Sequence, residues 1–180
     1  MSSAPVTLSP WVDDFDDHVD TFWELLRGNP VLDRLFYSAS TVGDFSAVWH
    51  AINLARLATA ADGRTRFVRL ATALAIESLL VNQVIKRAFR RERPEPPEDG
   101  DYHLRIPLTS SFPSGHASSA AMAARLLGQR SKLAPAYALI AGVVATSRLH
   151  VRIHHASDVI AGAAVGLSLA SIYKRAWPLS

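Results

Sequence analysis

The sequence predicts an all-α fold, in the form of an antiparallel helical bundle. Apolar stretches of helical length recur along the 180 residues, and each is bounded by Gly, Pro or charged residues. No segment alternates between apolar and polar residues with the period of two that is typical of strands. We expect about five core helices, preceded by an N-terminal amphipathic helix.

The first expected helix covers residues 11–27. Phe15, Val19, Phe22 and Leu26 recur at alternating steps of four and three, while acidic residues fill the opposite face. Such a helix either lies on a membrane surface or packs on the protein's own core. The sequence leaves both alternatives open.

The core helices follow a second helical region that begins after Gly28-Asn29-Pro30 and breaks near Gly43-Asp44. They are expected over residues 45–61, 67–85, 116–127, 133–147 and 159–173, with an extended Pro-rich loop from Pro94 to Pro113. The last two helices are each fifteen residues without a charge. They would be about 22 Å long, which is short of a hydrocarbon core of about 30 Å.

These apolar helices favour a polytopic membrane protein. Basic residues at the ends of the last two helices can snorkel to the interface and make up the missing length: Lys132, Arg148, Lys174 and Arg175. Gly162 and Gly166 form a small-residue face that permits close helix packing in a membrane. Buried helices of a soluble bundle are the alternative, because no run of 18 uninterrupted apolar residues exists.

Length and composition favour one domain without cysteine chemistry. We expect a single domain over residues 1–180, made of an amphipathic N-terminal segment (1–42) and a helical bundle (43–175). Cysteine is absent, which excludes disulfides, a zinc–thiolate site and a thiol nucleophile. The net charge is only +3, but basic residues crowd positions 86–93 and need an anionic partner or solvent.

Three polar clusters lie at the ends of the expected helices. The first runs from Lys86 to Pro94. Lys86 closes an apolar helix, and Arg93 stands just before the proline. A lysine and an arginine held in this way can grip a phosphate, the arginine as a planar fork with two donors.

The second cluster, Pro113-Ser114-Gly115-His116, opens an Ala-rich helix. The start of a helix offers free backbone N–H groups and the positive end of the dipole, which together favour an anion. Ser114 adds a hydroxyl donor, Gly115 lets the backbone approach closely, and His116 can donate a proton.

The third cluster, residues 147–158, contains Arg148, His154 and Asp158. If this stretch is helical, His154 and Asp158 share a face. The carboxylate can then hold the imidazole in one tautomer, which leaves the other nitrogen free to attack. A metal site made of His150, His154 and Asp158 is a rival interpretation, but it leaves the first two clusters unexplained.

Together the clusters resemble the motifs of the type 2 phosphatidic acid phosphatase superfamily. Its pattern is a lysine, six residues and Arg-Pro; then Pro-Ser-Gly-His; then Ser-Arg, five residues, His, three residues and Asp. All eleven fixed positions are filled in order: Lys86, Arg93, Pro94, Pro113, Ser114, Gly115, His116, Ser147, Arg148, His154 and Asp158. His155 and Ala156 stand where Tyr and Pro often follow the nucleophile, so the assignment of His154 depends on spacing.

The resemblance implies a membrane phosphatase that works through a phosphohistidine and needs neither a metal nor another cofactor. His154 attacks phosphorus, Asp158 orients His154, and His116 protonates the leaving oxygen. The residues implied to bind the phosphate are Lys86, Arg93, Ser114, Gly115 and Arg148.

The implied substrate is a phosphomonoester or diphosphate of a lipid: phosphatidate, a polyprenyl phosphate or diphosphate, or a polyprenyl-linked sugar phosphate. No nucleic-acid partner is expected. The same superfamily contains soluble acid phosphatases and vanadium-dependent haloperoxidases, which are the two alternative functions.

Alternating helices place the three clusters at one end of an antiparallel bundle. Basic residues gather in the turns and the terminus at the other end: Arg64, Arg66, Arg130, Lys132, Lys174 and Arg175. Short basic loops normally stay on the cytoplasmic side. We therefore expect a multi-pass protein of the cell membrane whose active site faces the extracytoplasmic side.

Overall fold

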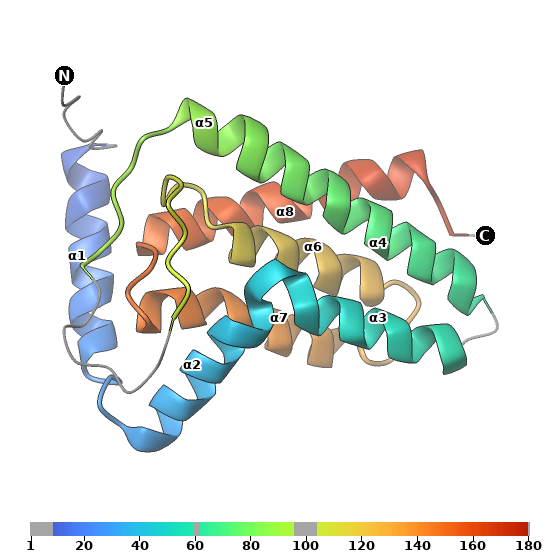
Figure 1. Ribbon diagram of the computed structural model, residues 1–180, viewed down its shortest axis with the longest axis horizontal. Helices are drawn as coiled ribbons and strands as arrows, with labels where there is room; N and C mark the ends of the chain where they lie inside the picture. Colours follow the sequence, from blue (N-terminus) through green and yellow to red (C-terminus); the bar gives the residue numbers. More distant parts are fainter. Residues whose placement is uncertain (1–8, 60–61, 96–103, 180) are drawn as a thin grey trace.

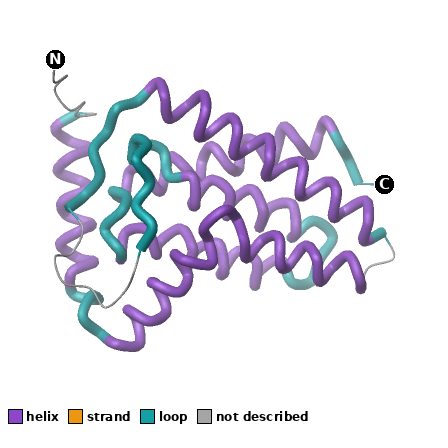
Figure 2. Tube along the Cα trace, in the orientation of Figure 1, coloured by secondary structure: helices purple, strands orange, loops and turns teal. Residues whose placement is uncertain are grey.

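The computed structural model describes residues 9–59, 62–95 and 104–179, and these residues form helices and loops without a strand (Figure 1, Figure 2). The α-helices are α1 (Pro10–Glu24), α2 (Pro30–Gly43), α3 (Ala47–Thr59), α4 (Gly63–Leu79), α5 (Lys86–Ala88), α6 (Gly115–Leu127), α7 (Ala134–His150) and α8 (Ala156–Ala176). A 3₁₀ turn, Asp44–Ser46, joins α2 to α3, and a π-helical segment, Leu80–Ile85, joins α4 to α5. The predicted all-α class is confirmed. The end of the predicted helix 45–61 and the middle of the predicted loop after Pro94 lie outside the described residues.

Local sequence signals account for the start of α2 and for its end. Pro30 occupies the first turn, and the side chain of Asn29 caps the helix by accepting backbone N–H groups two and three residues ahead at 3.0 and 3.3 Å. α2 and α3 are separated by a kink at which Phe45 and Ser46 have φ of 52° and 59°. Non-glycine residues rarely adopt this left-handed conformation. The predicted break at Gly43-Asp44 is therefore confirmed.

The bundle is built from α3, α4, α6, α7 and α8, with α6 in its middle (Figure 1). α6 buries a row of small and apolar side chains: Ala117, Ala120, Met122, Ala123, Leu126 and Leu127. α8 packs directly on α6, because a Cβ atom on Gly162 or Gly166 would lie 2.2 or 2.1 Å from a carbonyl oxygen of α6 or its cap. The predicted small-residue face is confirmed.

Two groups of loops lie at opposite ends of this bundle. At one end, Arg56 donates to the carbonyl of Leu127 at 2.8 Å, and Arg69 donates to the carbonyl of Trp177 at 2.8 Å. The end of α3, the start of α4, the end of α6 and Trp177 after α8 thus meet there. The three polar clusters lie at the other end, as the antiparallel arrangement predicts.

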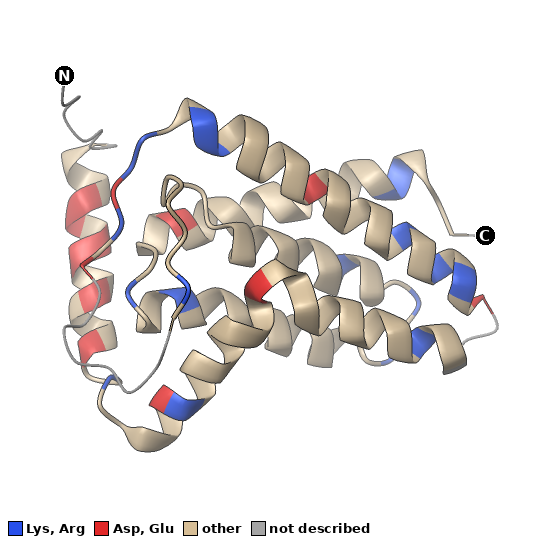
Figure 3. Ribbon diagram, viewed as in Figure 1, with Lys and Arg blue, Asp and Glu red and all other residues tan. Residues whose placement is uncertain are grey.

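α1 stands across the end that carries the polar clusters, with its acidic residues beside the basic segment after α5 (Figure 1, Figure 3). Asp16 is 4% exposed, whereas Trp11 and Phe22 are 74% and 60% exposed. Asp16 is therefore packed against the protein, while Phe15 and Phe22 of the predicted apolar stripe are exposed and its Val19 and Leu26 are half-buried. The reason is electrostatic, since Arg91 and Ser157 bind the Asp16 carboxylate.

Two helical stretches among the described residues are long and apolar enough to cross a membrane. The first, Gly63–Ala88, has 26 residues and runs from α4 through the π-helical segment into α5. The second is α8, with 21 residues. Both extend beyond the ranges expected from the sequence (67–85 and 159–173), because polar and charged residues at their ends, such as Arg64, Lys86, Asp158 and Lys174, are also helical. α7 has 17 residues, fewer than the roughly 20 of a typical span.

Candidate active site

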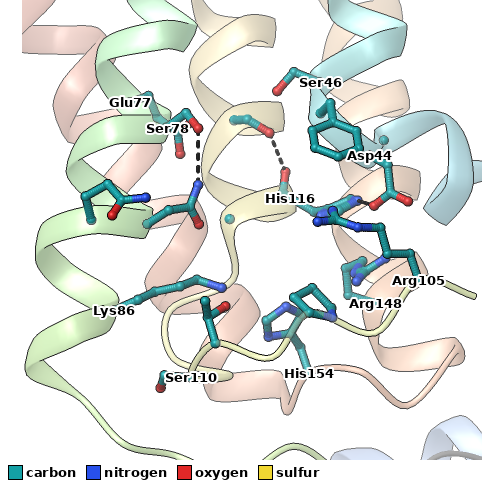
Figure 4. Close-up of a pocket in the computed structure, with 18 of the residues that line it drawn as sticks. Asp44, Ser46, Glu77, Ser78, Lys86, Arg105, Ser110, His116, Arg148 and His154 are labelled. Atoms are coloured by element: carbon teal, nitrogen blue, oxygen red, sulfur yellow. Dashed lines mark hydrogen bonds and ion pairs between the residues drawn. The ribbon is translucent and has the colours of Figure 1, made fainter.

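The predicted polar clusters converge on one cavity of about 1380 Å³ at their end of the bundle. Helix α4 with its π-helical extension, the 3₁₀ turn after α2, the start of α6 and the loop of residues 105–110 surround it (Figure 4). Six of the eight residues expected in the site line this cavity: Lys86, Arg93, Gly115, His116, Arg148 and His154. The convergence that was inferred from helix ends is thus present in the fold.

His154 lies in a non-helical turn between α7 and α8, so a continuous helix through residues 147–158, the condition under which His154 and Asp158 were expected to share a face, is not present. α7 ends at His150 and α8 begins at Ala156, because two short turns reverse the chain between them. The pairing with Asp158 nevertheless holds: His154 Nδ1 lies 3.5 Å from Asp158 Oδ2. This is a long contact, of the kind that tightens when a substrate is bound.

The other ring nitrogen of His154 faces the cavity. Nε2 lies 3.3 Å from Nη1 of Arg93. Since a guanidinium can only donate, Nε2 is an acceptor and the ring proton is on Nδ1, toward Asp158. Burial lowers the pKa of His154 well below its ordinary value; Asp158 opposes this shift, and the surrounding cations add to it. The imidazole is therefore neutral near pH 7.

Asp158 is fully buried at the first turn of α8. Its Oδ2 accepts the backbone N–H of His155 at 2.9 Å, which caps the helix. Its Oδ1 accepts Arg91 Nη1 at 2.8 Å. The carboxylate is thus held from two sides, and it lies behind the ring of His154, whose Nδ1 has no hydrogen bond in the described part of the chain.

The rival metal site is contradicted by the position of His150. The ring of His150 is held away from His154: Nε2 lies 2.7 Å from Asp33 Oδ1, and Nδ1 accepts the indole N–H of Trp23 at 3.2 Å. No group of three or more His, Asp or Glu side chains in the described residues converges as a metal ligand set would. The histidine at position 150 therefore supports the packing of α1 and α2 on α7.

Arg148 and Lys86 bring positive charge to the cavity. Arg148 is 1% exposed and donates from Nη1 to the hydroxyl of Ser40. Its Nε and Nη2 have no partner among residues 9–59, 62–95 and 104–179. Lys86 is buried at the start of α5, and its side chain extends toward His154 (Figure 4). Buried cations with unsatisfied donors are suited to a phosphate.

The guanidinium of Arg93, unlike that of Arg148, is largely hydrogen-bonded to the backbone. Besides His154, its guanidinium donates to backbone carbonyls at 2.8 to 3.3 Å, those of Pro107, Thr109, Ser110 and Ile153. Arg93 therefore ties the loop before α6 to the turn that carries His154. Its Nη1 still borders the cavity at the reactive nitrogen.

Ser114 and Gly115 form the start of α6. Ser114 is fully buried, and its hydroxyl caps the helix by accepting the N–H of Ala117 at 3.4 Å. It is not among the residues that line the cavity. Gly115 does line it, so the backbone at the helix start reaches the cavity while the Ser114 side chain supports it from behind.

His116 has a carboxylate partner that the sequence reasoning missed. Its Nε2 lies 3.1 Å from Asp44 Oδ1 and 3.3 Å from the carbonyl of Ser40. A Cβ atom on Gly43 would lie 2.7 Å from Cδ2 of the His116 ring, so the ring packs closely against a glycine. Burial raises the pKa of Asp44, but the hydrogen bond from His116 and nearby cations outweigh it and hold the pKa below its ordinary value.

Arg91 was also missed, although it lies inside the first cluster. Its guanidinium bridges two acids, with Nη1 2.8 Å from Asp158 and Nη2 2.6 Å from Asp16. Asp16 also accepts the backbone N–H and the hydroxyl of Ser157, at 2.7 and 2.6 Å. α1 is thereby joined to the residue that supports His154.

Comparison with known proteins supports the resemblance seen in the motifs. Residues 66–179 match the family model of the PAP2 superfamily. A decaprenylphosphoryl-5-phosphoribose phosphatase of Mycolicibacterium smegmatis is 39% identical over 138 residues, which cover 76% of this chain and 74% of the relative. The protein of the same name from Mycobacterium tuberculosis is 35% identical over 115 residues, 64% of each chain.

Two solved structures share the fold. LpxE of Aquifex aeolicus superposes with a TM-score of 0.74 at 22% identity, over 96% of this chain and 99% of that one. A transmembrane PAP2 type phosphatidylglycerolphosphate phosphatase from Bacillus subtilis gives a TM-score of 0.68 at 24% identity, over 93% and 87% of the two chains. At these identities the likeness concerns the fold.

Proposed function

The chain belongs to the PAP2 superfamily, and on this basis we propose that it removes the terminal phosphate of a polyprenyl-linked sugar phosphate through a phosphohistidine on His154. It is a phosphatase and a membrane protein, as its relatives are. The observation that carries the proposal is the position of His154 Nε2, unprotonated and facing a cavity lined by Lys86 and Arg148, with Asp158 behind the ring.

The reaction would proceed in two displacements. His154 Nε2 attacks phosphorus in line, so an N–P bond forms as the ester P–O bond breaks. Lys86, Arg148 and the backbone at Gly115 stabilise the equatorial oxygens, where negative charge accumulates. Since Asp44 and the Ser40 carbonyl hold Nε2–H of His116, the His116 imidazolium, with Asp44 as its counter-ion, gives the proton on Nδ1 to the leaving oxygen.

The second displacement releases phosphate. His116, now lacking that proton, accepts one from water as the water oxygen attacks phosphorus. The N–P bond breaks, inorganic phosphate leaves and both histidines return to their starting states. The lysine and arginines supply the positive charge that metal ions bring to many other phosphoryl transferases, so the mechanism requires no metal.

We propose further that the chain is one phosphatase domain that crosses the cell membrane several times, with the cavity on the extracytoplasmic side. The basic turns at the end opposite the cavity support this orientation (Figure 3). Because the chain has no cysteine, Leu108→Cys at the cavity end and Ser131→Cys at the other end can be labelled in intact cells with an impermeant thiol reagent. Labelling at 108 alone supports the orientation, and labelling at 131 alone reverses it.

The substrate is tested by measuring phosphate release in detergent with EDTA. The panel contains decaprenylphosphoryl-5-phosphoribose, phosphatidate, phosphatidylglycerolphosphate, a polyprenyl diphosphate and a soluble aryl phosphate. Highest kcat/KM on the sugar-bearing lipid, retained in EDTA, is the expected result. Highest kcat/KM on the soluble ester would instead indicate an acid phosphatase, and halide oxidation with added vanadate would indicate a haloperoxidase.

A further inference from the structure

A group of polar side chains interrupts the apolar surface of α4 inside the cavity. Glu77, Ser78, Asn82 and Gln83 all line it, although they belong to a stretch that is otherwise apolar enough to cross a membrane (Figure 4). Placing a carboxylate in such a helix costs free energy, so it is found where it binds a ligand or pairs with another group. None of these four residues belongs to the phosphate-binding motifs.

Glu77 is the most unusual member of the group. It is 3% exposed, and its Oε1 has no hydrogen-bond partner in the described part of the chain. The hydroxyl of Ser118 on α6 lies beside it and is likewise without a hydrogen bond, so this buried pair of polar groups is unsatisfied. Oε1 itself is shielded from solvent, but Glu77 lines the cavity, so a rotation of its side chain brings the carboxylate to a donor on a bound molecule.

Asn82 connects this acceptor to the phosphate end of the cavity. It sits in the π-helical segment, Leu80–Ile85, a rare helical form that is frequent at functional sites. Its Nδ2 donates to the hydroxyl of Ser78 at 3.2 Å. Its Oδ1 is 3.6 Å from the place where a Cβ on Gly115 would be, so the carboxamide borders the start of α6.

The cavity therefore changes in chemistry along α4. Lys86 and Gly115 mark the phosphate end, Asn82, Ser78 and Glu77 follow, and the next turns offer Leu74, Ala75 and Ala71. A ligand that fits this order carries a phosphate, then hydroxyl groups, then an apolar chain. An unsubstituted isoprenyl phosphate has no hydroxyl group to offer Glu77.

We propose that Glu77, together with Asn82 and Ser78, forms a subsite that binds hydroxyl groups of the leaving group, next to the transferred phosphate. The inference rests on the proposed phosphatase function and adds a basis for substrate choice. A site built to hydrogen-bond a hydroxyl discriminates strongly against an analogue without it, because the buried polar group is then left unpaired. Glu77 and Asn82 are specificity residues in this account.

The test compares two substrates on the full chain in detergent: a polyprenyl-linked ribose 5-phosphate and farnesyl phosphate, which has no hydroxyl group. In the wild type we expect higher kcat/KM on the sugar-bearing substrate. Glu77→Ala and Asn82→Ala should lower that value by roughly tenfold to hundredfold, chiefly through KM. Their kcat/KM on farnesyl phosphate should stay within about threefold of wild type.

Inhibition by orthovanadate provides the check on the phosphate end, since this ion needs no leaving-group subsite. An unchanged inhibition constant in Glu77→Ala shows that the variant is folded, and the isosteric Glu77→Gln repeats the test if Glu77→Ala does not fold.

Equal losses of kcat/KM on both substrates would overturn the subsite and assign Glu77 to balancing the charge of Lys86. Equal wild-type kcat/KM on the two substrates would also overturn it while leaving the phosphatase function intact. Failure to hydrolyse any phosphate ester would overturn the function itself.

Discussion

The carboxylate of Asp44 lies 3.1 Å from Nε2 of His116. Asp44 comes from the turn between α2 and α3, and His116 from the start of α6. The cavity thus holds two histidine–aspartate pairs, His154 with Asp158 and His116 with Asp44. One pair is suited to a nucleophile and the other to a proton donor.

Asp44→Asn should lower kcat by roughly tenfold to hundredfold, because the protonated form of His116 loses its counter-ion while the hydrogen bond is kept. The alkaline limb of the pH profile should move to lower pH, since His116 then gives up its proton more readily. Steady-state kinetics from pH 5 to 9 measure both effects. A change in KM alone, with the alkaline limb unmoved, would show that Asp44 does not act through His116.

Gly43→Ala should displace the ring of His116, because the new Cβ would lie 2.7 Å from its Cδ2 atom. A small displacement of a proton donor is expected to lower kcat by roughly tenfold to hundredfold. Gly142→Ala is the matched control, since nothing lies within 4 Å of a Cβ on that residue of α7. The control should keep wild-type kcat and be slightly more stable, because Ala favours a helix over Gly. Equal activity in the two variants would contradict the packing of His116 on Gly43.

Arg91→Met should destabilise the fold by about 3 kcal/mol, because it leaves Asp16 and Asp158 buried without their shared cation. It should also lower kcat, since Asp158 loses one of its two supports. Asp16→Asn should have a smaller effect, and the double variant should lose less than the sum of the two single losses. Thermal unfolding and kinetics of the three variants check this. Additive losses would show that α1 and the active site are not coupled through Arg91.

The acid limb of kcat/KM should lie below pH 6.5. Burial, reinforced by neighbouring cations, lowers the pKa of His154 below its ordinary value of 6.5. The ring is therefore still neutral, and able to attack phosphorus, when the pH has fallen to 6.5. The measurement is a pH–rate profile on a substrate whose own phosphate ionisation is known. An acid limb above pH 7 would mean that another group, or a charged His154, controls the reaction.

The sequence motifs alone predicted which residues come together in the cavity. Lys86, Gly115, His116, Arg148 and His154 lie at helix ends, and an antiparallel bundle must bring those ends together. His154 lies beside Asp158, as their spacing indicated, even though residue 154 lies in a turn before α8 rather than in a helix.

The residues that were missed act through partners far away in sequence. Asp44 carries no motif, and its only signal was a predicted helix break. In the sequence, Arg91 was one of several basic residues at positions 86–93, and Asp16 was one of the acidic residues opposite the apolar stripe of the first helix. The two are buried together as an ion pair. Such pairs depend on how α1 and α2 pack on the bundle, which the periodicity of a single helix does not specify.

The central claim, that His154 carries the phosphoryl group, is tested most directly by trapping the phosphoenzyme. The protein is quenched in alkali during turnover of a ³²P-labelled substrate, and the labelled residue is mapped. We predict an acid-labile, base-stable label on His154 in the wild type and in His155→Ala, and no label in His154→Ala. A label on His155, or one that persists in His154→Ala, would contradict the account.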